Sequence, residues 1–432
     1  MGKNVLALAA LLLLVGIGPV LSPAIVLEAE EPLSLPEVIE YSMQHNGELK
    51  SFREAKGIVD AGKVKAGLFP NPTLDIEALG GALTGSSAES TLSVGISQEF
   101  LLAGKRSKRL AVAEHELALY NSQLADKERL IREEVQTLFY DLKLAEQRLA
   151  LADHSIALNR KLLEISKNRL AAGDIPELEM NLVKVELARS EASRVEVANV
   201  LNQSHEKLAI ITALPVGKQY RVSEPFKITT TSTKALSELK QLAIAQRPDI
   251  KAMEAERGRD EAAVRLARAE RVPNLTAGVV LMHDTRSTKI GGLEGTDRAS
   301  TVGMKLSIPL PVFDRNQAGV QEALARQSSA ECRLSTAIRT LDREVETAYA
   351  SCQSSKKILS FYKADIIPQL EENLSLTEEA WSLGEVGIIA VLQEQRKFFD
   401  VRDNYLMALY NYQIALVKLD SAVAKDLNGE LP

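Results

Sequence analysis

The sequence has 432 residues; Ala, Leu, Glu, Lys and Arg supply 207 of them, or 48%, whereas aromatic residues supply only 4%. This composition is typical of long or coiled helices, and a compact enzyme core would contain more aromatic residues. The net charge of −6, without a Lys/Arg-rich stripe, argues against a nucleic-acid-binding protein. Two cysteines are too few for a disulfide framework or a Cys-based zinc module.

Residues 1–29 predict a secretory signal. Lys3 precedes an apolar run from Val5 to Leu27, and Glu residues follow it. Cleavage is expected after Ala24 or Ala29, and an uncleaved anchor is the alternative. Beyond residue 30 no apolar run approaches the roughly 18 residues of a transmembrane helix. We therefore expect an exported protein without a helical membrane span.

The rest of the chain is an internal repeat, with a first copy at 30–231 and a second at 232–432. Matching residues keep their order, and the offset between the copies drifts only slightly along the chain. The matches are Asn46-Gly47-Glu48-Leu49 with Arg247-Pro248-Asp249-Ile250 (offset 201), Thr91 with Thr301 and Glu134-Val135 with Glu344-Val345 (offset 210), and Gly173-Asp174-Ile175 with Gly384-Glu385-Val386 (offset 211).

Each copy predicts a helix, two strands, a long helix, a turn and a last helix. The first copy has helices at 35–69, 104–171 and 177–211, and strands at Thr73–Leu83 and Thr91–Glu99. The second has helices at 236–271, 314–382 and 388–424, strands at Asn274–Met282 and Thr301–Leu310, and a polar loop from His283 to Ser300 between the strands. Pro368 predicts a kink near the end of its helix.

The helix 104–171 carries an a/d seam, with Leu110 and Val135 each starting a seven-residue apolar series. Its 68 residues span roughly 100 Å at 1.5 Å per residue. The helices 35–69 and 177–211 span roughly 50 Å each, so two short helices end to end match one long helix. This arithmetic predicts a mainly α rod of long antiparallel coiled-coil helices, with the strands at one end and the turns at the other.

The strands alternate apolar and polar residues and have roughly ten residues each, the length of a tilted transmembrane β-strand. A soluble hairpin packed on helices is the alternative. Four strands cannot close a barrel. If the strands span a membrane, several chains must therefore share one barrel. Two chains would give eight strands, and three would give twelve with room for a channel. Asp75, Glu77, Thr301 and Lys305 would then face the lumen.

The chain resembles the TolC-like outer-membrane factors. The resemblance lies in the duplicated layout, the Phe69-Pro70-Asn71-Pro72-Thr73-Leu74 entry to the first strand, and the tip turns. The segments from Glu99 to Arg106 and from Ser307 to Gln317 are similar to the strand–helix junctions of the cobalt–zinc–cadmium (heavy-metal RND) branch. The resemblance implies a homotrimer with a twelve-stranded β-barrel in the outer membrane and a periplasmic α-helical tunnel. It also implies a periplasmic adaptor and an inner-membrane RND pump as partners.

The resemblance also implies that adaptor hairpins dock at the two turns, Gly173-Asp174-Ile175 and Gly384-Glu385-Val386. Both glycines suit a helix C-terminus in the left-handed region. Some family members carry constricting aspartates after the second turn, but Ala390 and Gln393 occupy those positions here. Glu179 is a candidate entrance constriction, with a solvated surface Glu as the alternative.

Catalytic, cofactor and metal sites are not predicted. The five histidines are scattered without an i,i+4 pair, and Gly104-Lys105-Arg106 lacks the pattern of a phosphate loop. Cys332 and Cys352 lie roughly 30 Å apart on one predicted helix and cannot bridge within the chain. We therefore expect a passive exit duct of a tripartite efflux system that exports heavy-metal cations. A channel for drugs or other organic solutes, and a periplasmic adaptor or coiled-coil scaffold, are the alternatives.

Overall fold

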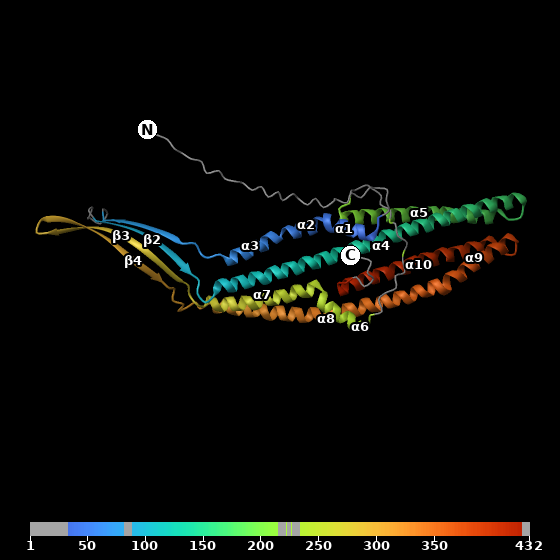
Figure 1. Ribbon diagram of the computed structural model, residues 1–432. Helices are drawn as coiled ribbons and strands as arrows, with labels where there is room; N and C mark the ends of the chain where they lie inside the picture. Colours follow the sequence, from blue (N-terminus) through green and yellow to red (C-terminus); the bar gives the residue numbers. More distant parts are fainter. Residues whose placement is uncertain (1–32, 82–88, 215–221, 223–225, 227–233, 426–432) are drawn as a thin grey trace, which may run out of the picture.

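A computed structural model describes residues 33–81, 89–214, 222, 226 and 234–425. The predicted signal, residues 1–29, lies outside the described residues. The chain is an elongated rod with all four strands at one end and two helical turns at the other (Figure 1). Within the described residues, no helix is both long enough and apolar enough to cross a membrane.

The two halves of the chain have the same order of elements. The first half contains α1 (Leu35–His45), α2 (Gly47–Glu54), α3 (Lys56–Gly67), β1 (Thr73–Gly80), β2 (Ser90–Phe100), α4 (Lys105–Ala172) and α5 (Glu177–Thr212). The second contains α6 (Leu236–Gln246), α7 (Pro248–Glu270), β3 (Leu275–Ile290), β4 (Leu293–Ser307), α8 (Gln317–Phe361), a π-helix (Tyr362–Ile366), α9 (Ile367–Ser382) and α10 (Ile388–Val423).

The seam predicted along the long helix is confirmed. In α4 all thirteen residues of the two heptad series, from Leu110 to Leu170, are buried or half-buried. Val135 and Leu142 are fully buried and pack with α1 and α5 in the core of the first half. Val345 and Tyr412 are equally buried in the core of the second half, between α8, α10 and α6. Antiparallel helix pairs therefore form the body of the rod.

The predictions of single helices at 35–69 and 236–271 were wrong, because both helices break. The breaks at Asn46 (φ −58°, ψ 121°) and Arg247 (φ −55°, ψ 121°) are at equivalent positions of the repeat, and the first helix is interrupted again at Ala55, between α2 and α3. Each side chain bonds the end of the last helix of its own half: Asn46 Nδ2 donates to the Ile211 carbonyl at 2.7 Å, and Arg247 Nη1 to the Ala422 carbonyl at 3.3 Å. The break therefore lets the side chain at the break, Asn46 or Arg247, reach the last helix of its own half.

The strands form one antiparallel sheet in the order β1-β2-β3-β4. The polar loop predicted from His283 to Ser300 was wrong: pairing continues from His283↔Ser300 to Ile290↔Leu293. The chain reverses at Gly291 (φ 63°) and Gly292 (φ 87°), the left-handed conformation that a tight hairpin needs. The sequence from His283 to Ser300 lacks the alternation of apolar and polar residues from which strands are predicted.

One face of the sheet is apolar and open. Ile76, Ile96, Leu281 and Val302 are each between 57% and 71% exposed. On the other face Val280 pairs with Gly95 on one side and Gly303 on the other. A Cβ on Gly303 would lie 3.2 Å from Val280 Cγ1, so the glycines leave room for the Val280 side chain on this face.

Pro368, where the sequence predicts a kink, is the second residue of α9 and lies two residues after the end of the π-helix Tyr362–Ile366. Proline has no backbone N–H and cannot close a normal α-helical turn. The Ile367 N–H donates instead to the Tyr362 carbonyl, five residues earlier. The irregular turn thus lies where the proline interrupts the α-helical pattern.

Candidate functional site

Both turns at the helical end of the rod have the backbone that the sequence predicts. Gly173 (φ 81°) and Gly384 (φ 79°) are left-handed. The Asp174 N–H donates to the Arg169 carbonyl at 2.8 Å, and the Glu385 N–H donates to the Ala380 carbonyl at 2.9 Å. These bonds satisfy carbonyls at the helix ends that otherwise lack partners.

An apolar cluster joins the two turns, although they lie in different halves of the chain. Leu162 and Val183 come from the α4–α5 hairpin, and Trp381, Ile388 and Val391 from the α9–α10 hairpin. Trp381 is 4% exposed. Val386, from the second predicted docking turn, packs against this cluster. Ile175, from the first turn, is also buried.

Arginines add polar links between the hairpins. Arg169 donates to the Trp381 carbonyl at 2.8 Å, and its guanidinium carbon lies 5.1 Å from the centre of the indole ring. Arg396 of α10 forms an ion pair with Glu186 of α5, whose side chain is 11% exposed. Sequence reasoning missed these four residues. The only Trp of the chain, three residues before Gly384, was the available signal.

Glu179 lies half-buried in the first turn of α5, beside the other turn. The Cβ position of Gly387 is 3.9 Å from Glu179 Oε1. The structure therefore brings Glu179 to the helical end of the rod, close to the second predicted docking turn. Within the described part of the chain, no group of three or more His, Cys, Asp or Glu side chains could hold a metal ion.

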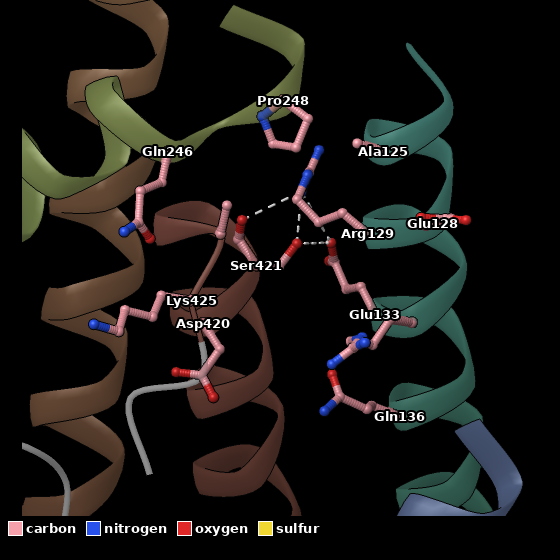
Figure 2. Close-up of a pocket in the computed structure, with 12 residues that line it drawn as sticks. Ala125, Glu128, Arg129, Glu133, Gln136, Gln246, Pro248, Asp420, Ser421 and Lys425 are labelled. Atoms are coloured by element: carbon pink, nitrogen blue, oxygen red, sulfur yellow. Dashed lines mark hydrogen bonds and ion pairs between the residues drawn. The ribbon is translucent and has the colours of Figure 1, made fainter. Parts of the chain in front are cut away.

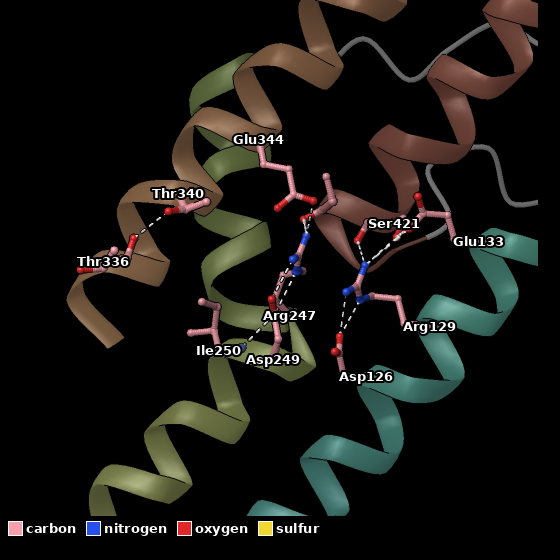
Figure 3. Close-up of polar contacts among 11 residues, drawn as sticks. Asp126, Arg129, Glu133, Arg247, Asp249, Ile250, Thr336, Thr340, Glu344 and Ser421 are labelled. Carbon is pink, nitrogen blue, oxygen red and sulfur yellow. Dashed lines mark hydrogen bonds and ion pairs between the residues drawn. The ribbon is translucent and has the colours of Figure 1, made fainter. Parts of the chain in front are cut away.

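A second polar centre lies halfway along the rod, where the two halves meet (Figure 3). The Arg247 side chain is 6% exposed and pairs with Asp249 at 2.7 Å and with Glu344 at 3.0 Å. Burial opposes ionisation of Asp249, but its hydrogen bonds from Arg247 outweigh burial and hold its pKa below the ordinary value. The joint between α6 and α7 is thus tied to α8 by charge as well as by packing.

Arg129 of α4 faces this joint from the other half. It donates to Ser421 Oγ of α10 at 2.6 Å, and Ser421 in turn donates to Glu133 at 2.5 Å. These residues line a cleft of about 320 Å³ between α4, the α6–α7 joint and the end of α10 (Figure 2). Both acidic and basic side chains line this cleft. Their charges balance, so the cleft is better suited to holding the two halves together than to binding a charged ligand.

A group of polar side chains connects the sheet to the helices. Lys105, at the start of α4, is 4% exposed, and its Nζ donates to Asn274 Oδ1 at 2.5 Å. Asn274 Nδ2 donates to Glu99 at 2.6 Å. Glu99 and Lys105 belong to the junction segment that sequence analysis singled out, and Asn274 precedes β3. The junction motif therefore connects the strands of one half to those of the other.

A comparison with protein families agrees with the repeated layout of the structure. The family described as "Outer membrane efflux protein" matches residues 60–213 and 239–425, one stretch in each half of the chain. The chain belongs to the outer membrane efflux protein family. It is thus an outer-membrane efflux channel with a periplasmic part and is not an enzyme.

Named relatives place it near metal-resistance proteins of this family. The chain is 25% identical to the cobalt-zinc-cadmium resistance protein CzcC of Cupriavidus metallidurans, over 92% of both chains. It is 27% identical to the cation efflux system protein CusC of Escherichia coli K12, over 82% of this chain and 78% of that protein. A crystal structure of CusC has the same fold, with a TM-score of 0.75, 19% identity and coverage of 90% and 91% of the two chains.

Proposed function

We propose that three copies of this chain form the exit duct of a tripartite efflux system, with one twelve-stranded β-barrel and a helical tunnel. The observation that carries the proposal is the open sheet: β1 and β4 are both edges, and the apolar face is exposed. Unpaired strand edges are not stable in lipid. Pairing of β4 with β1 of the next copy removes every edge, and three copies close a ring.

In this assembly the apolar face contacts lipid, and the polar face lines the lumen. Asp75 and Glu77 of β1, and Thr301 and Lys305 of β4, lie on the polar face, which supports their assignment to the lumen. Three copies would repeat each charge around the pore. Such rings filter solutes by charge and size, whereas an upstream pump would supply the driving force.

The helical end is the proposed adaptor-docking surface. The turns Gly173-Asp174-Ile175 and Gly384-Glu385-Val386 lie close together there, and the Trp381 cluster supports them as one unit. A periplasmic adaptor would contact these turns and connect the duct to an inner-membrane RND pump. Glu179 is proposed to supply one carboxylate per chain at the entrance, because it lies beside Gly387.

Heavy-metal cations are the proposed substrate, on the basis of the names of CzcC and CusC. Organic solutes are the second candidate. The other class of function, a free periplasmic adaptor or scaffold, fits less well, because such a protein has no use for a sheet with an exposed apolar face.

The test combines assembly and transport. A strain without the gene receives the wild type, a tip variant (Asp174→Lys with Glu385→Lys), or a control variant (Glu116→Lys, an exposed residue of α4 near the sheet). We expect heat-sensitive trimers in unheated gels for all three proteins. Tolerance to zinc, cobalt, cadmium and copper should return with the wild type and the control but not with the tip variant.

A protein that stays monomeric in detergent would refute the duct. Recovery of drug tolerance without metal tolerance would move the substrate to organic solutes. Full activity of the tip variant would refute docking at the two turns.

A further inference from the structure

Two buried amide side chains near the helical end of the rod have oxygen atoms without a hydrogen bond. Asn159 of α4 and Gln395 of α10 are each 3% exposed. Within the part of the chain that the structure describes, no donor reaches Asn159 Oδ1 or Gln395 Oε1. Buried polar atoms rarely remain without a hydrogen bond, so each of these oxygens requires an explanation.

Neighbouring groups fix which atom of each amide is free. Asn159 Nδ2 donates to Ser190 Oγ at 2.7 Å, and this hydroxyl uses its only proton on the Glu186 carbonyl at 2.9 Å. Ser190 therefore accepts from Asn159 and has no second proton to donate. Gln395 Nε2 donates to Glu378 Oε1 at 3.4 Å, and a carboxylate only accepts. Turning either amide over would place oxygen against oxygen, so the carbonyl oxygens are the free atoms.

Both amides line one cleft of about 140 Å³, the hairpin cleft, which lies between α4, α5 and α10. Ser155, Ser190 and Glu186 also line it. Glu186 is 8% exposed, and both hydrogen bonds from Arg396 go to its Oε2 atom, which leaves Oε1 as a further acceptor. The hairpin cleft therefore gathers amide, hydroxyl and carboxylate oxygens from three helices.

This set of groups suits a cation better than water. A bound water both donates and accepts, whereas the free buried atoms of the hairpin cleft are acceptors. Amide carbonyl and carboxylate oxygens are ligands of Ca²⁺, which tolerates irregular geometry, whereas Mg²⁺ demands a regular octahedron. Borderline and soft metals prefer His or Cys, and neither is among the described residues that line the cleft.

The charges around the hairpin cleft set the expected affinity. Two acidic residues, Glu186 and Asp400, are balanced by two basic residues, Arg189 and Arg396. Of these four side chains only Glu186 is buried. Because the affinity for Ca²⁺ rises with the number of charged ligands, we expect a dissociation constant of about 1 mM.

We propose that the hairpin cleft binds one Ca²⁺ ion through Asn159 Oδ1, Gln395 Oε1 and the Glu186 carboxylate. The ion joins α4 and α5 of the first half to α10 of the second, in addition to the ion pair between Glu186 and Arg396. All its ligands come from one chain, so the site depends neither on the proposed trimer nor on the proposed substrate.

The single tryptophan of the chain provides the assay. Trp381 and Leu392 belong to one apolar cluster, and Leu392 also lines the hairpin cleft. Tb³⁺ occupies Ca²⁺ sites and emits when an indole close to it is excited, so Tb³⁺ is the probe for the purified full-length protein in detergent. We expect indole-sensitised emission that Ca²⁺ displaces at about millimolar concentration and Mg²⁺ displaces less effectively.

Three variants test the ligands. Asn159→Leu and Gln395→Leu each remove one oxygen and should lower the affinity for Tb³⁺ and Ca²⁺ by about tenfold or more, whereas Asn159→Asp adds a charged ligand and should raise it by about tenfold. Asn202→Leu is the matched control, because Asn202 is an exposed amide of α5 that does not line the cleft. Indole emission without Tb³⁺ shows whether the Trp381 cluster stays folded. If the leucine variants unfold it, Asn159→Asp decides.

The absence of indole-sensitised emission, or emission that Ca²⁺ does not displace, would overturn the proposal and indicate a cleft filled by water only. An unchanged or lower affinity in Asn159→Asp would also overturn it. A signal that is lost in Glu179→Gln but kept in both leucine variants would place the cation at the entrance instead of in the hairpin cleft.

Discussion

Trp381 is expected to hold the two hairpins of the helical end together, so Trp381→Ala should release them. The side chain is 4% exposed and packs with Leu162 and Val183 across the hairpin boundary. Truncating a buried Trp costs about 3–5 kcal/mol. Loss of the cation–π contact with Arg169 adds about 1 kcal/mol. Because these terms overlap, we expect a local loss of about 4 kcal/mol.

Amide hydrogen exchange measures this loss directly. A change of about 4 kcal/mol corresponds to on the order of a thousandfold faster exchange around residues 377–392, since 1.4 kcal/mol is tenfold. Residues 408–423 of α10, in the core of the second half, should keep their protection. Leu383→Ala is the control, because Leu383 is 69% exposed in the same turn.

Unchanged exchange at the tip in Trp381→Ala would refute the reasoning. Equal acceleration in the core of α10 would also refute it, because it would mean that the hairpin end does not open as a separate unit. If the turns dock an adaptor, the same variant should lower metal tolerance without loss of trimers.

Two further changes test the middle of the rod. Arg247→Ala should destabilise the protein by about 3 kcal/mol, because it leaves Asp249 without its buried partner. The thermal midpoint of unfolding should therefore fall, and an unchanged midpoint would contradict this expectation. The pKa of Asp249 is lowered on folding, so its contribution is complete above about pH 5 and is lost as pH falls through the folded pKa; the difference between wild type and variant should shrink below about pH 4. Gly258→Ala should lower the thermal midpoint, because the new Cβ crowds His115. Crowding costs about 1–3 kcal/mol, which outweighs the gain of about 1 kcal/mol in helix propensity. Gly57→Ala, where a Cβ meets no atom within 4 Å, should not lower the thermal midpoint. Adding His115→Ala should rescue Gly258→Ala, and a failure to do so would assign the loss to another cause.

The long helices could be predicted because their signals are periodic and sustained. The seam of α4 extends over the whole helix, and Gly173 marks its end within one residue. The breaks at Asn46 and Arg247 were missed because apolar periodicity continues through them. Gly47 and Pro248, directly after each break, were the local signals, and the physical reason is the tertiary bond to the returning helix.

The helical end illustrates another limit. The two turns could be located and assigned to one end of the rod from sequence, but the contacts between them could not, because these depend on packing between halves about two hundred residues apart. Arg169 and Trp381 are ordinary helix residues until the hairpins meet. Likewise the part of the β3–β4 ribbon from His283 to Ser300 has no apolar–polar alternation, so its backbone pairing could not be predicted from the sequence.

The π-helix at Tyr362–Ile366 lies where the offset between the two halves changes by one residue. The offset between the halves is 210 at Glu134 and Glu344 but 211 at Gly173 and Gly384, so one residue was inserted or deleted between these points. A single added residue in an α-helix would rotate everything beyond it by about 100°. A π turn absorbs the extra residue as a local bulge. After duplication, an indel could therefore be tolerated in one half while the two turns still met at the same level.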